Sequence, residues 1–366
     1  MSENHIQTDV LIVGGGPSGA SAAISLLTYS NLSVTLVEQS DFNQTRVGEH
    51  VSASIFDLIG YLKLSRNDFD VDCFRPSYAS KAYWGSDKVS TTHSIFTTED
   101  STFQMDRETF DFKLIEVAAE RGATIFPRTK CMKYVQLPDS AWKISAQHPE
   151  QKTFTIHARY LVDATGRSGN VCRMVGAPSQ KYDSLVGVGL FLDRKEANFE
   201  HVLESVEMGW WYAASLPDHK MVMTLFTDAD LVSEHKLHQL DVWKKALFQT
   251  KQIRHLLSGD QVFHDSLWIR SAHTQMSDVR SVERFVAIGD AAVSFDPISS
   301  MGIGFAISSA SFAAKHIVQE LERGSKTIDV FQQDILKNFE QYRRIKDRYY
   351  GKERRWAESR FWKRRH

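Results

Sequence analysis

The chain contains little cysteine. Its three cysteines, Cys73, Cys131 and Cys172, are spread over 366 residues and form no Cys-x-x-Cys pair or zinc-ligand pattern. An odd number of widely spaced cysteines excludes the disulfide framework that holds small secreted domains together. We therefore expect reduced thiols in a reducing compartment, and no metal site.

An excess of one charge and long apolar runs are also missing. The 44 basic and 45 acidic residues give a net charge of −1, which excludes a chain that binds nucleic acid through its overall charge. The polar N-terminus has no basic-then-apolar leader, and no run of eighteen apolar residues occurs. These absences predict a cytoplasmic protein without nucleic-acid or membrane partners. The length suits two domains or one large α/β domain with an insertion.

The most informative segment present is residues 9–27, DVLIVGGGPSGASAAISLL. An apolar strand leads into Gly14-x-Gly16-x-x-Gly19 and then into an alanine-rich helix, the order that a dinucleotide pyrophosphate requires. Gly14 permits a sharp turn, Gly16 permits close approach of the phosphates, and Gly19 permits the helix to pack on the sheet. A second strand, residues 33–37, ends at Glu38, whose carboxylate is placed to bind a ribose hydroxyl.

A second complete glycine fingerprint is absent. Gly187-x-Gly189 and Gly302-x-Gly304 lack the third glycine and the preceding strand. The chain therefore has one built-in dinucleotide site and no separate nicotinamide domain. This favours FAD over NAD as the resident cofactor.

Two further segments support FAD. Residues 159–172, RYLVDATGRSGNVC, combine a strand with a turn of small residues, and residues 285–304, FVAIGDAAVSFDPISSMGIG, combine a strand, Gly-Asp and a glycine-started helix. Together with the first loop, this three-part set resembles the group A flavin monooxygenase and flavin halogenase superfamily over nearly the whole chain. The resemblance implies an α/β fold: a Rossmann-like FAD-binding domain as in p-hydroxybenzoate hydroxylase, an antiparallel substrate sheet and a C-terminal helical segment.

The resemblance also implies roles for individual residues. Asp290 would bind a ribityl hydroxyl, and the helix from Gly302 would direct its positive end at the flavin pyrimidine ring. Arg46, in an Arg-x-Gly-Glu element, and Arg107 would reach the cofactor. The full set of expected FAD contacts is Gly14, Gly16, Pro17, Ser18, Gly19, Glu38, Arg46, Arg107, Asp163, Gly166, Gly289, Asp290, Pro297, Gly302, Ile303 and Gly304.

The pattern of strands and helices divides the chain into three parts. Short alternating stretches in residues 124–162 predict an antiparallel meander, and longer strands at 185–192 and 220–227 predict the substrate sheet. We expect a discontinuous FAD-binding domain from residues 1–77, 106–175 and 276–326. We expect a substrate domain from 78–105 and 176–275, and a helical segment from 327–366.

The expected substrate side contains three adjacent aromatic residues, Trp210, Trp211 and Tyr212. Their rings would line a dry pocket, although a sheet-core strand explains them equally well. Flavin halogenases carry a related tryptophan motif and a lysine for which Lys81 is the candidate. However, Ser299 stands where tryptophan halogenases typically have glutamate, which disfavours halogenation. Of the histidines that could handle protons, His50 is the first candidate for a catalytic role.

The C-terminal segment from Tyr342 carries eleven lysines or arginines against three acids, interleaved with aromatic residues. Tyr349, Trp356 and Trp362 recur at near-helical spacing, which predicts either a docked amphipathic helix or a surface for a protein partner. With the Val-Gly-Glu-His and Gly-Trp-Trp-Tyr segments, this tail resembles the flavoprotein modifying enzymes that mature the cysteine tryptophylquinone of bacterial glycine oxidase and lysine ε-oxidase.

That narrower resemblance implies an FAD-dependent monooxygenase that hydroxylates a tryptophan side chain of a precursor protein through a flavin hydroperoxide. The partners would be the precursor of a quinoprotein amino-acid oxidase and a reductant, either NAD(P)H or an external flavin reductase. Two alternatives remain open: a small-molecule flavin monooxygenase or halogenase, and a non-catalytic FAD-binding maturation chaperone. Oxygen added to a precursor tryptophan would distinguish the first function from the others.

Overall fold

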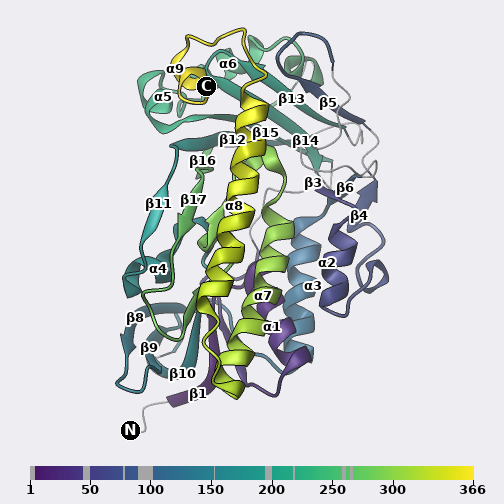
Figure 1. Cartoon of the computed structure of the whole chain (residues 1–366). Coiled ribbons are helices and arrows are strands. Elements are labelled where there is room, and N and C mark those ends of the chain that lie inside the picture. The colour runs from purple at the N-terminus through teal and green to yellow at the C-terminus, as the bar shows by residue number, and fades with distance from the viewer. Residues whose placement is uncertain are drawn as a thin grey trace.

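The computed structural model describes residues 5–43, 50–76, 79–89, 102–151, 153–193, 200–216, 219–257, 261–263 and 267–366. A seven-stranded sheet forms the lower half in Figure 1, and a six-stranded sheet lies across the top. Within the described residues, no helix is long and apolar enough to cross a membrane.

The lower sheet has a parallel centre and an antiparallel edge. Strands β7, β2, β1 and β10 pair in parallel, and β10 continues into the antiparallel strands β9 and β8. β10 pairs β9 through its first half and the parallel strand β18 through its last three residues. The strands are β1 (His5–Val13), β2 (Val34–Val37), β7 (Thr124–Phe126), β8 (Lys130–Gln136), β9 (Trp142–Gln147), β10 (Phe154–Asp163) and β18 (Phe285–Ala287). The antiparallel meander predicted for residues 124–162 is confirmed for β8, β9 and β10, whereas β7 at its start pairs in parallel with β2.

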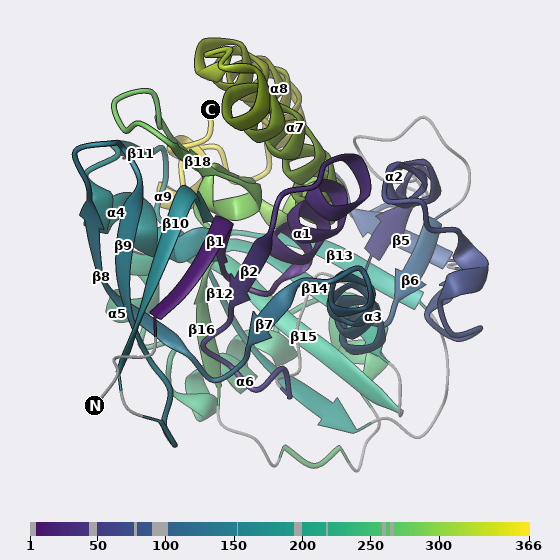
Figure 2. The same cartoon turned by 90° about the horizontal axis from the view of Figure 1, so that it is seen from below.

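Helices cover this sheet because its central strands are buried on both faces. β1 and β2 have no exposed residue from Val10 to Val13 and from Val34 to Val37, as parallel strands in an α/β layer require. Figure 2 shows α1 and α7 side by side on one face of the sheet, with α8 beyond them. The long helices are α1 (Pro17–Tyr29), α3 (Arg107–Glu120), α7 (Gly302–Arg323) and α8 (Ile328–Tyr350).

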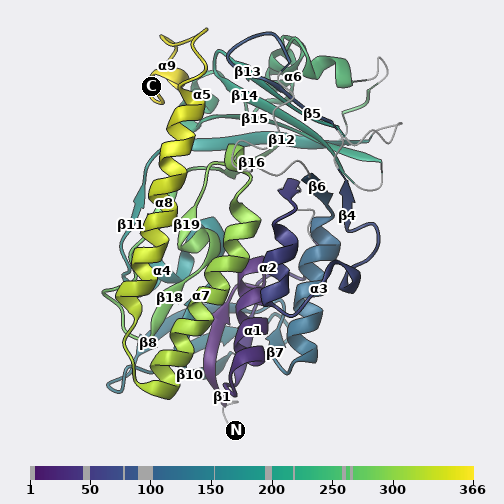
Figure 3. The same cartoon turned by 45° about the vertical axis from the view of Figure 1, so that its right-hand side comes forward.

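The upper sheet is antiparallel in the order β16-β12-β15-β14-β13, with β5 added in parallel to β13. Its strands are β5 (Ala79–Tyr83), β12 (Leu185–Asp193), β13 (Glu200–Val206), β14 (Gly209–Leu216), β15 (Lys220–Asp228) and β16 (Trp268–Ser271). The strands expected at 185–192 and 220–227 are confirmed. α6 (Leu240–Phe248) covers one face through Trp243 and Leu247. The other face points toward the lower half of the molecule (Figure 3).

Smaller elements connect the two halves. Two three-stranded sheets lie between them, β3-β6-β4 and β11-β17-β19. Of the predicted segment 78–105, β5 joins the upper sheet, whereas β6 pairs with β3 and β4. The remaining elements are β3 (His50–Ser52), β4 (Phe74–Pro76), β6 (Thr102–Met105), β11 (Ser179–Lys181), β17 (Gln275–Ser277), β19 (Val293–Ser294), α2 (Ile55–Tyr61), α4 (Asn170–Val175), α5 (Ala229–Glu234), α9 (Arg360–Lys363), and the 3-10 helices η1 (Arg66–Asp68), η2 (Gly166–Ser168), η3 (Ile253–Leu256), η4 (Gly289–Ala291) and η5 (Pro297–Ser299).

The C-terminal segment differs in one respect from the expectation. A helix does begin after Thr327, but it ends at Tyr350, and turns lead to the short α9. Tyr349, Trp356 and Trp362 therefore do not share one helix. Gly351 is the C-cap residue of α8, and the chain then folds back so that Tyr349 and Trp362 pack in one aromatic cluster. The spacing of these three aromatic residues matches a helical period, but no continuous helix joins them. Tertiary packing brings their rings together.

Candidate functional site

The glycine loop between β1 and α1 is packed against the end of β10. Gly14 has φ +113°, and a Cβ there would lie 2.2 Å from the Ala164 carbonyl oxygen. A Cβ on Gly19 would lie 1.9 Å from the Gly14 carbonyl oxygen. Both contacts are with backbone, which cannot move aside, so only glycine fits. The turn and the close helix packing expected of these two glycines are thus seen directly.

The N-terminus of α1 is left available for a ligand. Gly16 is the N-cap residue, Pro17 occupies the first turn, and no side chain of the described residues caps the helix. The first turn of a helix has N–H groups without intrahelical partners, and these groups together with the helix dipole favour an anion. Ser18 and Pro17 therefore lie where the resemblance predicts contact with phosphate.

Glu38 connects β2 to this loop. One carboxylate oxygen, Oε2, accepts a hydrogen bond of 2.6 Å from the Gly15 N–H, and Oε1 accepts one of 2.7 Å from the Ser40 N–H. The carboxylate therefore lies at the carboxyl end of the parallel strands, next to the glycine turn. This is the edge at which open α/β sheets bind their ligands. Contact between Glu38 and a ribose remains a prediction.

Asp163 organises the turn that follows β10. It is fully buried; Oδ1 accepts from the Thr165 N–H and hydroxyl at 2.8 and 2.6 Å, and Oδ2 accepts from the Cys172 N–H at 2.8 Å. Burial raises the pKa of Asp163, and these hydrogen bonds oppose the rise. Both oxygens thus hold η2 and α4, including Gly166, in place. Sequence patterns could not distinguish this role from direct cofactor contact.

Asp290 forms an ion pair with Arg167 that the sequence patterns do not indicate. Arg167 Nε lies 3.2 Å from Asp290 Oδ2, and the same guanidinium donates to the carbonyl oxygens of His273 and Phe295 at 3.0 and 2.6 Å. The β10 turn and the Gly-Asp turn are therefore joined by one arginine. The only indication in the sequence was the arginine directly after Gly166. The motif was recognised by its small residues, so this arginine was not considered.

The Gly-Asp turn contacts both helices of the site. Gly289 has φ +55°, its N–H donates to Ser309 Oγ on α7 at 2.9 Å, and a Cβ there would lie 2.8 Å from Ser18 Cβ on α1. α7 begins at Gly302 without a side-chain cap, and nothing in the described structure lies within 4 Å of a Cβ built on Gly302. This region therefore fits an elongated anionic dinucleotide. It offers two helix starts without side-chain caps, one of them beside open space, and the Asp290 turn.

The remaining expected FAD contacts lie around this centre. Pro297 begins η5, and Ile303 and Gly304 lie in the first turn of α7, where a Cβ on Gly304 would meet Leu58 at 3.3 Å. Arg107 donates to both oxygens of Asp111, at 3.1 and 2.8 Å, within its own helix. Arg46 lies outside the described residues. FAD contacts by these residues stay predictions.

Two histidines meet between the small sheet β3-β6-β4 and the upper sheet. The rings of His50 on β3 and His201 on β13 lie 4.1 Å apart between centroids, and in the described structure His50 Nε2 is buried without a hydrogen-bond partner. Burial lowers the pKa of His50 to about 4, and burial together with the nearby His50 lowers the pKa of His201 to about 3. Both rings are therefore neutral at pH 7 and are weak bases, so the catalytic role of His50 stays a prediction.

The three adjacent aromatics of β14 do not share one pocket. Trp210 stacks on Phe226 at 4.1 Å on the face toward the lower half, whereas Trp211 packs against Trp243 of α6 on the opposite face. Both tryptophans are 1% exposed and belong to the sheet core. Tyr212, partly buried on the face of Trp210, is the member of the motif that remains a candidate for substrate contact.

Lys81 lies on the other face of the upper sheet from Tyr212. Its register partner is Val202, which packs with Trp211 and α6, and Tyr83 on the same side of β5 joins that cluster. Neighbouring register partners point to the same face of a sheet. The structure therefore does not bring Lys81 and Tyr212 together.

A residue absent from the predicted set, Trp268 on β16, borders the inner face. Its indole N–H is buried, with no hydrogen-bond partner in the described structure, and its ring packs near Phe191 and Tyr212. A buried donor without a partner is costly in a folded protein, so Trp268 is a candidate for contact with substrate or water. An isolated tryptophan carries no sequence signal for that position.

Comparison with known proteins decides the family. A family model described as FAD binding domain matches residues 7–342. The chain belongs to this FAD-binding family. LodB of Marinomonas mediterranea, assigned as an FAD-dependent oxidoreductase, is 42% identical over 360 residues, covering 98% of this chain and 96% of LodB. The tryptophan 2-halogenase of Chondromyces crocatus is 24% identical over 366 residues, covering 96% of this chain and 66% of the halogenase.

Solved structures of FAD-family proteins share the fold. The flavin-dependent halogenase CmlS aligns with TM-score 0.85 and 24% identity, over 98% of this chain and 68% of CmlS. QhpG, a peptidyl tryptophan dihydroxylase essential for tryptophylquinone cofactor biogenesis, aligns with TM-score 0.72 and 22% identity, over 98% of this chain and 78% of QhpG. The FAD-binding protein is thus an FAD-dependent oxidoreductase, and the predicted fold and cofactor are confirmed.

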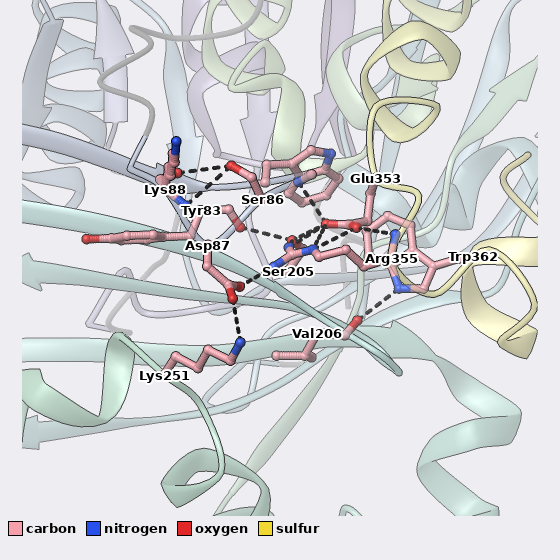
Figure 4. Close-up of polar contacts among 12 residues, drawn as sticks. Tyr83, Ser86, Asp87, Lys88, Ser205, Val206, Lys251, Glu353, Arg355 and Trp362 are labelled. Atoms are coloured by element: carbon pink, nitrogen blue, oxygen red, sulfur yellow. Dashed lines mark hydrogen bonds and ion pairs between the residues drawn. The ribbon is translucent and has the colours of Figure 1, made fainter.

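The basic tail of this FAD-binding protein is docked on the upper sheet. Figure 4 shows Glu353 at the centre of its contacts: the buried carboxylate accepts from the Gly85 N–H, the Ser205 hydroxyl and Arg355 at 2.6–3.3 Å. Arg355 also binds Asp87 at 2.6 Å. Burial raises the pKa of Glu353, but the hydrogen bonds outweigh it and bring the pKa to about 2. Much of the tail's charge is therefore matched by this chain's own acids.

Acid is expected to destabilise the protein through the histidine pair. The unfolded chain binds protons near pH 6.5, whereas folded His50 resists protonation until about pH 4, so stability falls as pH decreases through that interval. We expect a loss of about 2–4 kcal/mol between pH 7 and pH 5, measured by urea unfolding. His50→Phe should flatten this dependence, and replacement of the exposed His238 by phenylalanine should not. An unchanged slope in His50→Phe would contradict the assignment.

Proposed function

We propose that this FAD-dependent oxidoreductase hydroxylates a tryptophan side chain of a precursor protein during cysteine tryptophylquinone biogenesis. The fold shared with QhpG over nearly the whole chain supports the reaction class. The structural observation that favours hydroxylation over halogenation is the placement of Lys81. Lys81, the candidate for the catalytic lysine of a halogenase, lies on the sheet face covered by α6. Tyr212 lies on the opposite face, toward α7.

The chain's own residues give such a reaction a suitable surrounding. When bound and reduced, FAD would activate molecular oxygen for the hydroxylation, and the protein would supply position and the exclusion of water. The helix dipole at Gly302 favours negative charge in front of α7. The inner sheet face offers the aromatic and aliphatic side chains of Tyr212, Ala214 and Phe191, which exclude water. His50 contacts His201, the register partner of Ala214, and its neutral ring is a weak base there.

The proposed partner is the precursor of a quinoprotein amino-acid oxidase, and the reductant is NAD(P)H or an external flavin reductase. A basic, aromatic tail is compatible with protein binding because Arg, Tyr and Trp are favoured at interfaces. However, many of its charges are already paired within the chain. Recognition of the precursor therefore cannot depend on the net charge of the tail alone.

Co-expression of the protein with a candidate precursor, followed by mass spectrometry of the precursor, tests the proposal. We expect one or two oxygen atoms on a tryptophan, and the same product from Lys81→Met, because Lys81 lies on the outer face. Halogen incorporation that disappears in Lys81→Met would establish the halogenase instead. A precursor that binds but stays unmodified under reducing, aerobic conditions would establish a maturation chaperone.

A further inference from the structure

The hydroxyl of Tyr350, at the end of α8, connects two parts of the protein that are far apart in sequence. It accepts a hydrogen bond of 3.0 Å from the Trp210 indole N–H on β14 and donates one of 2.8 Å to Asp296 Oδ2. Tyr350 is 1% exposed and Trp210 is equally buried. The substrate sheet, the C-terminal helix and the loop before α7 are thus joined by one buried hydroxyl.

Asp296 is the residue on which this loop depends. It is 1% exposed, its Oδ1 accepts from the Ile298 N–H at 3.0 Å, and its own N–H donates to the Tyr342 hydroxyl at 2.8 Å. Tyr342 in turn lies 3.0 Å from Thr274 Oγ1. Two tyrosines from the last turns of α8 therefore hold one aspartate from opposite sides, through its carboxylate and its backbone.

The loop needs such support because its backbone is unusual. Ser300 has φ +51°, a conformation that non-glycine residues seldom adopt, and it lies two residues before Gly302. Ser299 Oγ donates to the Asp296 carbonyl oxygen at 2.8 Å, which links the strained turn to the same aspartate. Movement of Asp296 would be passed directly to the start of α7.

α8 is held at both ends, so Tyr350 is a fixed point. At its start, Gln332 donates to the Ser277 carbonyl oxygen and accepts from the Val279 N–H, at 3.0 and 3.3 Å. Beyond its end, Arg365 binds Asp228 at 2.6 Å and lies over the Tyr350 ring at 5.5 Å. Figure 1 shows the helix running from the lower half to the upper sheet. The helix can therefore transmit the position of the sheet to the loop.

We propose that Tyr350 is a positioning residue for FAD: through Asp296 it sets the place of the α7 N-terminus relative to the substrate sheet. This role of Tyr350 depends on the FAD site alone and is independent of the substrate. A buried hydrogen bond to a charged group contributes more than an ordinary one, and its loss leaves Asp296 under-satisfied. If the hydrogen bond is lost, the loop should relax and FAD should bind more weakly, although no residue predicted to contact FAD has been replaced.

Tyr350→Phe tests the proposal, with Tyr349→Phe as the matched control. Tyr349 packs its ring in the same cluster, but no hydrogen bond of its hydroxyl occurs in the described part of the chain. We expect Tyr350→Phe to raise the FAD dissociation constant about tenfold. It should also shrink the rise in melting temperature on adding FAD to the apoprotein. Tyr349→Phe should change neither quantity.

Tyr342→Phe provides a second route if Tyr350→Phe does not fold. It removes the hydroxyl that accepts from the Asp296 N–H and should weaken FAD binding in the same direction. A lower melting temperature of the apoprotein with an unchanged FAD dissociation constant in either variant would show a purely structural role and overturn the proposal. FAD binding and melting are measured without substrate, so this result is independent of the proposed tryptophan hydroxylation.

Discussion

Replacement of Gly16 by valine is expected to abolish FAD binding while the protein stays folded. Gly16 caps α1 with φ −73°, a conformation that valine can adopt, so the backbone need not change. A branched side chain at this position would occupy the space in front of the helix N-terminus, where the phosphates must approach the N–H groups. We expect FAD affinity to fall by at least about 100-fold, measured by flavin absorbance after gel filtration.

Two other glycines provide the comparison. Gly14→Ala should destabilise the fold itself, because the new methyl group would lie 2.2 Å from the Ala164 carbonyl oxygen at a φ of +113°. Gly60→Ala should leave both folding and FAD binding intact, because a Cβ on this α2 residue meets nothing within 4 Å. Flavin absorbance retained by folded Gly16→Val would remove the first loop from the FAD site.

The parts of the fold that local sequence determines could be predicted. The strand, turn and helix at Gly14–Gly19 depend on steric demands that glycine alone satisfies, and the buried parallel strands read as continuous apolar runs. The Gly-Asp turn at Asp290 and the helix from Gly302 were identified from the order of strand, Gly-Asp and glycine-started helix in residues 285–304. Their assembly into one site follows from the parallel order of β1, β10 and β18, whose carboxyl ends meet at one edge.

The side-chain arrangement between these elements could not be predicted. Arg167 reaches Asp290 across 123 residues of sequence, and the two carboxylate oxygens of Asp163 bind Thr165 and the Cys172 N–H of α4. The faces of the upper sheet were also undetermined, because the aromatic run at Trp210–Tyr212 does not indicate which ring points toward the cofactor side. Such contacts depend on register and packing between distant strands, for which a single sequence carries no pattern.

The tail was predicted to be either a docked amphipathic helix or a surface for a protein partner. Eleven basic residues after Tyr342 drew attention to a surface for partners. In the structure, Arg364 and Arg365 bind Asp228, and Arg360 binds Asp230, while Phe361 and Trp362 are buried. The aromatic residues and the matched acids make this segment part of the sheet's own core, so its first contribution is to stability.

Trp362→Ala should therefore destabilise the protein by about 3–5 kcal/mol, the cost of removing a large buried aromatic side chain. Trp362 is completely buried, packs edge-on against Trp84 at 5.3 Å, and donates its indole N–H to the Val206 carbonyl oxygen at 2.9 Å. The substitution leaves a cavity beside Tyr350 and removes the indole N–H that the Val206 carbonyl accepts at the end of β13.

Urea unfolding of Trp362→Ala and Lys363→Ala side by side separates packing from charge. The Lys363 side chain is 71% exposed and lies 3.9 Å from a nearly fully exposed Glu358, so its removal should change the unfolding free energy by less than about 0.5 kcal/mol. A loss below about 1 kcal/mol for Trp362→Ala would mean that the tail is an appendage rather than part of the core. If the loss is as large as expected, tail variants will contain less folded protein. Their precursor affinity must then be compared at equal concentrations of folded protein before a change is attributed to recognition.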